Sequence, residues 1–209
     1  MLLDEIKSPY DGAILGQVPI ATLEDLNLVL ANAQTGANLW RRTPAHIRSE
    51  VLLKAAEITA QNIEELAQTI SGETGKSITE ARAEASRCPE IIKLSAFEGS
   101  QLYGSTLPLD ANKGTGFEKI GFTLRQPVGV VVAISPFNYP ALLVLHKIAP
   151  ALAVGNAVVL KPARTTPLSA LLIAKYFTQA GLPDNALQVI TGPGSTLGDA
   201  LVSDPRVRK

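Results

Sequence analysis

The stretch of residues 128–162 constrains the fold of this chain more than any other part of its sequence. It begins with an uninterrupted apolar run at 128–134, passes through a proline-flanked turn and an apolar helical segment at about 141–153, and ends with a second apolar run at 157–161 that closes on Lys161. Polar residues do not alternate with apolar ones in either run. Short connections and strands of this kind are typical of a parallel sheet whose two faces are both covered.

The same alternation continues to the end of the sequence. It predicts a helix at about 167–180, a strand at 186–191 and a helix at about 195–202, and residues 206–209 are typical of the start of another strand. A threonine-proline pair begins the first of these helices and a glycine ends it, as capping preferences predict. Residues 128–209 therefore predict an α/β fold with an open, Rossmann-like parallel sheet.

The amino-terminal part of the sequence has a different pattern. Turn residues around short apolar pairs in residues 1–21 favour small edge strands. Helical spacing then begins at Thr22, which fits an N-cap with Asp25 three residues later. Thr43-Pro44 is expected to open a long helix that runs through Leu66.

Two further signals divide this helical region. Ser77 and Glu80 form a capping-box pattern. Pro89 should kink or split the helix that follows, because proline supplies no N–H and crowds the preceding turn. We therefore expect residues 22–100 to form a layer of two to four helices.

Residues 102–127 interrupt the helical pattern with an excursion of two strands. Residues 106–109 and 117–125 are strand-like, and a stretch containing glycine and asparagine separates them. An isolated hairpin is only marginally stable in water, so this one is expected to pack on something outside its own segment. A neighbouring subunit is one candidate.

Charge and hydropathy exclude several classes of partner. The net charge is +0 with both signs scattered along the chain, so no electrostatic field favours nucleic acid, a membrane or acidic partners. The N-terminus lacks the basic and apolar regions of a secretory signal. The longest apolar run, residues 128–134, has the length of a strand and not of a membrane span. A cytoplasmic protein is expected.

The single cysteine, Cys88, excludes an internal disulfide. It lies on an apolar helical stripe with Ala81, Ala85 and Ile92, so a buried structural thiol is expected. His146 lies in a helix that should pack on the sheet, and we expect a hydrogen-bonded structural histidine there in preference to a catalytic base. No metal site is expected.

Three short motifs follow three successive strands of the predicted sheet. They are SPFNYP at residues 135–140, KPAR at 161–164 and GPGS at 192–195. In a parallel sheet these strand ends open into one crevice, where doubly wound folds bind ligands. Backbone N–H groups and a cation that converge there suit an anionic cofactor.

Each motif also has an ordinary structural interpretation. Lys161 alone would more often be a solvated lysine at a strand end. Asn138 could bond its own backbone in a turn, and the glycines at 192 and 194 could form a tight turn at a helix start. Taken together, at equivalent positions of one sheet, they favour a ligand site.

The sequence resembles the aldehyde dehydrogenase superfamily. The residues that carry the resemblance are SPFNYP at 135–140, KIAPAL at 147–152, GN at 155–156, KP at 161–162 and AGLP at 180–183, and it extends upstream through ETGK at 73–76. It covers nearly the whole chain. It implies an NAD(P)-binding domain made of residues 1–104 and 128–209, with residues 105–127 as a strand pair of the oligomerisation domain.

The resemblance also implies roles for single residues. In the family a cysteine thiolate attacks the aldehyde and a glutamate activates water to hydrolyse the thioester. Asn138 would donate its side-chain N–H to the oxyanion, and Lys161 would bond the adenosine ribose hydroxyls. The remaining cofactor-binding positions implied are Ile134, Ser135, Pro136, Phe137 and Ala163 along the cleft, Arg164 beside the ribose, and Gly194 and Ser195 against the adenosine half.

Arg164 departs from much of the family, because many members that prefer NAD carry glutamate at this position. A glutamate accepts from both ribose hydroxyls and repels a 2′-phosphate, whereas an arginine could pair with that phosphate. We expect NADP, alone or alongside NAD, to be the cofactor. The alternative is an exposed arginine that does not contact the cofactor.

Arg87 and Tyr139 resemble the non-phosphorylating glyceraldehyde-3-phosphate dehydrogenase branch of the superfamily. There Arg87 would receive an anionic substrate tail. A salt bridge on the helix surface is the alternative role for this arginine.

The expected protein is the amino-terminal, NAD(P)-binding portion of an aldehyde dehydrogenase, with a truncated aldehyde dehydrogenase fold that lacks the catalytic domain, the nucleophile and the base. The isolated chain should be inactive, and the full-length parent should be a homo-oligomer that oxidises a small aldehyde. The alternatives are a standalone nucleotide-binding module and a structural partner that completes a separate chain carrying the cysteine.

Overall fold

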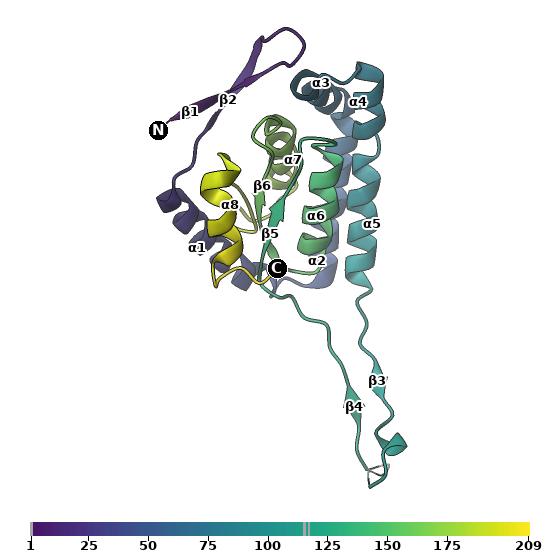
Figure 1. The fold of residues 1–209 in the computed structure, drawn as a ribbon. Coiled ribbons are helices and arrows are strands. Elements are labelled where there is room, and N and C mark those ends of the chain that lie inside the picture. Colours follow the sequence, from purple (N-terminus) through teal and green to yellow (C-terminus); the bar gives the residue numbers. More distant parts are fainter. Residues whose placement is uncertain (1, 115, 117) are drawn as a thin grey trace.

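The computed structural model describes residues 2–114, 116 and 118–209. Figure 1 shows an α/β body from which a narrow two-stranded arm projects, with a small hairpin at the amino-terminal end. The body holds a parallel sheet between helices, as the sequence predicts.

The sheet contains β5 (Val130–Ile134), β6 (Ala157–Lys161) and β7 (Leu187–Val189) in the order β5-β6-β7, all parallel. Val207 forms a parallel bridge to Val130 on the free side of β5. Residues 206–209 therefore lie where the next strand of the sheet would start, as predicted. The strands lie where they were predicted, although β5 starts two residues later and β7 is shorter. Gly129, with φ +120°, turns the chain just before β5.

Helices cover both faces of this sheet. α6 (Leu142–Ala153) and α7 (Leu168–Gln179) pack on one face, where Val158 and Leu160 point. α1 (Leu23–Trp40) and α8 (Gly194–Ser203) pack on the other, where Ala157 and Val159 point. Every residue of β6 is buried, as a central strand covered on both faces requires.

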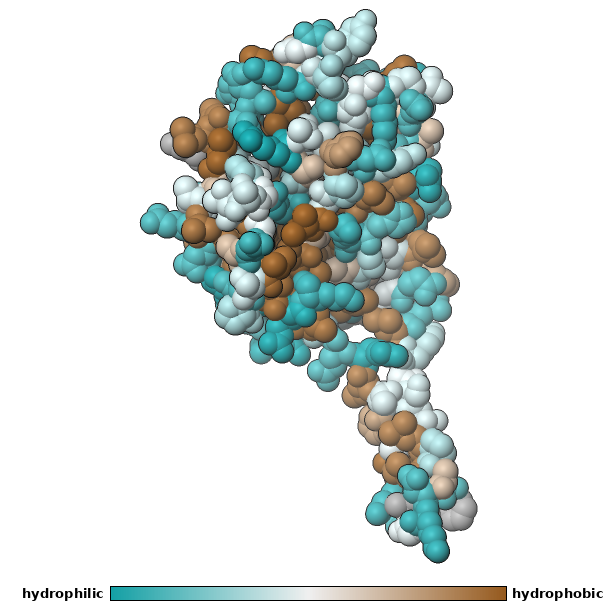
Figure 2. All heavy atoms as spheres, in the orientation of Figure 1, coloured by the Kyte–Doolittle hydropathy of each residue, from teal (hydrophilic) through white to brown (hydrophobic). Residues whose placement is uncertain are grey.

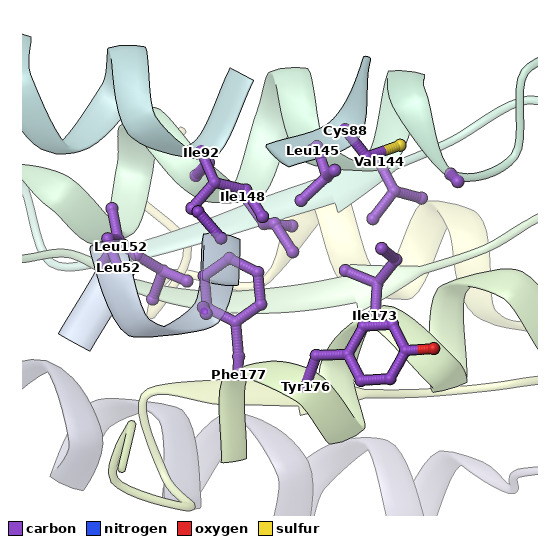
Figure 3. Close-up of a cluster of buried hydrophobic side chains, with 14 of the residues drawn as sticks. Leu52, Cys88, Ile92, Val144, Leu145, Ile148, Leu152, Ile173, Tyr176 and Phe177 are labelled. Atoms are coloured by element: carbon purple, nitrogen blue, oxygen red, sulfur yellow. The ribbon is translucent and has the colours of Figure 1, made fainter. Parts of the chain in front are cut away.

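Behind α6 and α7 lies a second helical layer. It consists of α2 (Ala45–Gln61), α3 (Ile63–Thr74), α4 (Ile78–Ala85) and α5 (Cys88–Ser100). Figure 3 shows the core between the layers, where Phe177 and Ile173 of α7 point toward the apolar side chains of α6. Cys88 lies in this core and is buried, and burial raises the pKa of its thiol well above the ordinary range. The predicted structural thiol is confirmed.

The predicted layer of two to four helices was wrong in two respects. Residues 22–100 form five helices, and the first of them lies on the opposite face of the sheet from the others. The long helix expected from Pro44 begins at Ala45 and breaks at Asn62, whose Nδ2 donates to the carbonyl of Ile58 at 2.7 Å and ends the helix locally.

Two predicted caps agree with the structure, whereas the helices expected to open at Thr43-Pro44 and at Thr166-Pro167 begin one residue later, at Ala45 and Leu168, without a side-chain cap. Thr22 and Asp25 form a reciprocal capping box at the start of α1. The hydroxyl of Ser77 accepts from the backbone N–H of Glu80 at 3.3 Å. Pro89 lies in the first turn of α5 and separates it from α4, so it splits the helix as expected.

Two buried glutamates join the helical layer to the helices on the sheet. Glu84 of α4 accepts the backbone N–H groups of Ala141 and Leu142, at 3.1 and 3.2 Å, where α6 begins. Glu73 of α3 does the same at the start of α7, where it accepts from Leu168 and Ser169 at 2.8 and 3.0 Å. Carboxylates at helix N-termini satisfy the free donors and complement the helix dipole.

Two hairpins complete the fold. β1 (Leu3–Lys7) and β2 (Ile14–Pro19) form the predicted small strands, and the backbone N–H of Ala21, just after β2, donates to the carbonyl of Thr191 at 3.0 Å. β3 (Thr106–Leu107) and β4 (Gly121–Phe122), with the short helix η1 (Leu109–Ala111) between them, form the arm.

The paired part of the arm is much shorter than the predicted strands at 106–109 and 117–125, and Phe117 lies outside the described residues. Its apolar side chains are exposed, among them Leu107, Ile120, Phe122 and Leu124 (Figure 2). That the arm packs on another subunit stays a prediction. In the part of the chain that the structure describes, no helix is both long and apolar enough to cross a membrane.

The ionisation of Glu73 should make the stability of the fold depend on pH. Burial raises the pKa of Glu73 to about 7, with a further rise from nearby Glu84, against hydrogen bonds from Ser169 and Leu168 that lower it. The unfolded chain releases this proton near the ordinary glutamate pKa of 4.5, so the free energy of unfolding should fall as pH rises from about 4.5 to about 7.

Denaturant unfolding at pH 5 and pH 8 measures this effect. Between these values the wild-type chain should lose roughly 2–3 kcal/mol more stability than Glu73→Gln, which keeps an acceptor at the start of α7 but cannot ionise. Equal losses in the two proteins would contradict the assignment.

Candidate functional site

The carboxyl ends of the parallel strands bring three loops together at one edge of the sheet. Ile134 and Lys161 are register partners, and the backbone N–H of Ser135 donates to the carbonyl of Lys161 at 3.1 Å. On the other side of β6, the N–H of Ile190 donates to Leu160 at 2.9 Å. The loops after β5, β6 and β7 therefore leave the same edge, as the sequence predicts (Figure 1).

The direction of winding reverses next to β5. α6 and α7 lead to β6 and β7 on one side, whereas α8 crosses the opposite face and brings Val207 beside Val130 on the other side. In open α/β sheets, ligands bind at such a point, outside the carboxyl ends of the strands. The loop that carries Asn138 begins there.

Lys161 is a buried cation with a weak partner. The residue is only 5% exposed, and its Nζ donates to the carbonyl of Pro162 at 3.4 Å. No described carboxylate forms an ion pair with it, and burial lowers its pKa. The alternative of a solvated lysine at a strand end is therefore wrong. An ammonium group with unused donors at a ligand-binding edge is suited to oxygen acceptors of a ligand.

The loop after β5 presents both apolar and polar groups. Ser135 is buried, whereas Ile134, Pro136 and Asn138 are exposed, and Phe137 exposes 65% of its surface. No hydrogen bond joins the Asn138 side chain to the described residues, so the alternative that this amide bonds its own backbone in a turn is not supported. Its N–H₂ group can donate to a bound molecule.

Tyr139 has a strained backbone, and a neighbouring cation stacks on its ring. Its φ is +54°, in the left-handed region, which costs a residue other than glycine about 1–2 kcal/mol. The Nζ of Lys76 lies 3.7 Å from the ring centroid, and a contact of this kind contributes about 0.5–2 kcal/mol. The two energies are of similar size, so the stacking can offset most of the strain.

Arg164, after β6, is already paired. Its Nε and a terminal nitrogen lie 2.5 and 3.1 Å from the two carboxylate oxygens of Asp4 on β1. The guanidinium holds the pKa of Asp4 below its usual range. Ala163 is half-buried beside it, and both line a small hollow with Thr191 and Gly192. The amino-terminal hairpin thus reaches the second and third strand ends.

The third loop leads directly into α8. Gly192 has φ +144°, a value that glycine adopts readily, and the helix starts at Gly194. Gly194 and Ser195 are exposed, and a side chain at 194 would meet no atom within 4 Å. The interpretation as a turn at a helix start is correct locally. The first N–H groups of α8 are nonetheless open at the site.

Arg87 and Tyr139 line one hollow of about 160 Å³, together with Lys76, Glu80 and Glu84. The sequence resemblance singled out Arg87 and Tyr139 together, and the structure places both in this hollow. Arg87 is exposed and forms no ion pair with any residue that the structure describes, so the alternative of a surface salt bridge is wrong. Its charge is available to the hollow.

His146 is exposed, so the expectation of a hydrogen-bonded structural histidine is wrong. Positions 144, 145, 148 and 149 form the buried face of α6, and position 146 lies outside it. His146 lines a broad groove of about 880 Å³ beside β5, with Val131, Ile134 and Val207. Figure 2 shows apolar side chains gathered on this face, over the position of β5.

Sequence reasoning gave no role to Lys76, Glu84, Glu73 or Asp4. One signal could have identified the glutamates, because each has a buried apolar residue at i−3 on its helix, Ile70 for Glu73 and Ala81 for Glu84. A charge on an apolar stripe indicates a buried partner. Nothing in the sequence links Asp4 to a residue 160 positions away.

Comparison with known proteins identifies the family. The model of the "Aldehyde dehydrogenase family" matches residues 4–209. The chain is 40% identical to 3-sulfolactaldehyde dehydrogenase of Priestia aryabhattai over 97% of its length, and 41% identical to NADP-dependent glyceraldehyde-3-phosphate dehydrogenase of Streptococcus equinus over 98%. It spans 42% and 43% of the length of these relatives.

Solved structures agree with this result. The crystal structure of NADP-dependent glyceraldehyde-3-phosphate dehydrogenase from Bacillus halodurans C-125 complexed with NADP superposes with a TM-score of 0.96 at 38% identity, and covers 99% of this chain and 43% of the other. Succinate-semialdehyde dehydrogenase from Burkholderia pseudomallei gives 0.94 at 33%, with 100% and 42% covered. The chain, with its parallel sheet and its three strand-end loops, belongs to the aldehyde dehydrogenase family.

Proposed function

We propose that this chain is the NAD(P)-binding part of an enzyme that oxidises an aldehyde to a carboxylic acid. The observation that carries the proposal is the buried Lys161, an ammonium group with unused donors at the edge of the sheet where three loops meet. The relative from Bacillus halodurans, which has the same fold, was solved with NADP. Bound NAD(P)⁺ supplies the hydride acceptor for such an oxidation.

The chain's own residues fit a dinucleotide. Lys161 donates to the hydroxyls of the adenosine ribose, and the exposed ring of Phe137 offers an apolar surface in the cleft. The remaining proposed contacts are Ile134, Ser135, Pro136 and Ala163 along the cleft, and Gly194 and Ser195 against the adenosine half. The open N–H groups at the start of α8 suit the negative charge of such a ligand.

Asn138 is proposed as the oxyanion donor. Its exposed amide has no partner among the described residues, so it is free to donate to an oxygen that gains negative charge when a thiolate attacks the aldehyde. One donor of this kind is worth about 10²–10³ in rate. Cys88 cannot be the nucleophile, because it is buried in the core and its pKa is raised.

The position of Cys88 favours a second candidate for the chain by itself. Cys88 is the only cysteine in the sequence, so these 209 residues carry no exposed thiol. Alone, the chain would then be a nucleotide-binding or structural module that completes a separate cysteine-bearing chain. Aldehyde oxidation that appears only on mixing with such a chain supports this candidate, and activity of the chain alone contradicts both proposals.

The hollow that Arg87 and Tyr139 line favours aldehydes with an anionic tail. Arg87, which forms no ion pair with a residue that the structure describes, supplies a charge there, and the hydroxyl of Tyr139 can add a hydrogen bond. Several relatives are named for substrates with a sulfonate, carboxylate or phosphate group, including 3-sulfolactaldehyde and glyceraldehyde-3-phosphate. Another relative is a phenylacetaldehyde dehydrogenase, whose named substrate carries no anionic group. The proposal of an anionic tail therefore rests on Arg87 and Tyr139 of this chain and not on the names of its relatives.

The arm is proposed to join a neighbouring subunit. Within its described residues the strands pair over two positions, and its apolar side chains are exposed. An extension of this kind needs a packing partner to be stable. In this proposal residues 1–104 and 128–209 form the cofactor-binding domain, residues 105–127 belong to an oligomerisation domain, and the assembled enzyme is a homo-oligomer.

A substitution of Lys161 tests the cofactor site. Calorimetric titration of the chain with NADP and NAD should show binding that Lys161→Met weakens at least tenfold, because the substitution removes hydrogen bonds from a charged donor. Lys175→Met changes an exposed lysine of α7 and should leave binding unchanged. Failure of the wild-type chain to bind either nucleotide would refute the cofactor site.

Substitutions of Asp4 and Arg164 test the choice between the cofactors. Because Asp4 occupies the guanidinium of Arg164, Asp4→Asn should free it for a 2′-phosphate and raise the affinity for NADP relative to NAD by roughly tenfold. Arg164→Glu should lower the same ratio. Glu64→Gln opens the similar exposed pair between Glu64 and Arg82 and serves as the control. A ratio that none of these substitutions changes would show that Arg164 does not select the cofactor.

A further inference from the structure

The loop that carries Asn138 is held from outside by Lys76. This lysine follows Gly75, the left-handed residue that ends α3, and 21% of its side chain is exposed. Its Nζ lies 3.1 Å from Oε2 of Glu84 and 3.7 Å from the ring centroid of Tyr139. One ammonium group therefore joins the helical layer to the residue next to Asn138.

Glu84 makes this contact rigid. Its side chain is fully buried, and its Oε1 accepts the backbone N–H groups of Ala141 and Leu142 at the start of α6. The two oxygens of one carboxylate thus fix the helix that follows the loop and the cation that stacks on the loop. Lys76 cannot move without leaving a buried carboxylate oxygen without its charged partner.

The backbone of Tyr139 passes this constraint to Asn138. Tyr139 is the only non-glycine residue with a positive φ in the described part of the chain, so the turn there depends on contacts that hold its side chain. Its ring is held by the Lys76 ammonium group, and Ala141, two residues further along the chain, is held by Glu84. The backbone of Tyr139 therefore sets the direction in which the side chain of Asn138 points from the loop.

We propose that Lys76 is a positioning residue that holds the amide of Asn138 in the direction required of an oxyanion donor. The proposal rests on the proposed role of Asn138. It also gives different roles to Lys76 and Arg87, the two cations that line the hollow. Glu84 neutralises Lys76, which holds the loop, whereas Arg87 forms no ion pair with a described residue and stays available to a substrate.

The test uses the side-chain amide signals of asparagine in ¹⁵N NMR spectra of the chain. Asn138→Ser identifies the Asn138 signal by its loss. Lys76→Met keeps the length of the side chain but removes the charge, and it should shift or broaden the Asn138 signal. Lys76→Arg should restore the wild-type position, because a guanidinium can pair with Glu84 and stack on Tyr139. Tyr139→Leu should reproduce the effect of Lys76→Met.

Lys93→Met is the matched control, because Lys93 forms an exposed ion pair with Glu90 and does not contact the loop. It should leave the Asn138 signal unchanged. If Lys76→Met does not fold, Tyr139→Leu decides the question, because it leaves the pair of Lys76 and Glu84 in place. An Asn138 signal that stays unchanged in the folded variants, or that moves equally in Lys93→Met, overturns the proposal.

Titration of the same samples with NADP separates this proposal from the proposed function. If NADP does not bind while the Asn138 signal follows the Lys76 variants, the cofactor site fails and the positioning contact stands. If NADP binds while the Asn138 signal ignores Lys76, the positioning role fails alone.

Discussion

The hydrogen bonds from two buried glutamates to the starts of two helices hold the rest of this structure in place. Glu84 and Glu73 extend from the outer helical layer to the first N–H groups of α6 and α7. These helices begin just after the loops that carry Asn138 and Arg164. Fixing the helix starts therefore fixes the loops, and the strand ends keep their geometry.

Burial of a carboxylate is costly, and this cost explains the arrangement around each glutamate. Each accepts two backbone donors, and Glu84 also has the ammonium group of Lys76 at 3.1 Å. Removal of one partner from such a group costs several kcal/mol, so the layers cannot shift independently. Glu73 lacks a cation of its own among the described residues, and burial raises its pKa to about 7.

Local signals in the sequence predicted the elements well. The valine-rich runs predicted the parallel strands, and β6 agrees residue for residue at Ala157–Lys161. Thr22 and Ser77 marked helix starts and Pro89 marked a split, because caps and proline breaks depend on neighbours within a few positions. The break at Asn62 was missed, since it depends on one hydrogen bond from the Asn62 side chain to the carbonyl of Ile58. The same side chain could equally have pointed to solvent.

The candidate site was predictable only in part, for the same reason. Parallel strands bring their ends together, so the loops at Asn138, Lys161 and Gly194 could be placed from the sequence. The contacts that hold them join residues far apart in the chain, such as Asp4 and Arg164 or Glu84 and Ala141. His146 was misassigned because the pattern predicted a helix that packs on the sheet but not which side of that helix stays exposed.

The most direct test of the proposed cofactor site is a crystal structure of the chain grown with NADP. We expect the adenosine half of the nucleotide to lie at the strand ends against Gly194 and Ser195, with the ribose hydroxyls within hydrogen-bond distance of the Lys161 ammonium group. A nucleotide bound elsewhere, or a Lys161 that still contacts only the carbonyl of Pro162 beside the bound nucleotide, would contradict it.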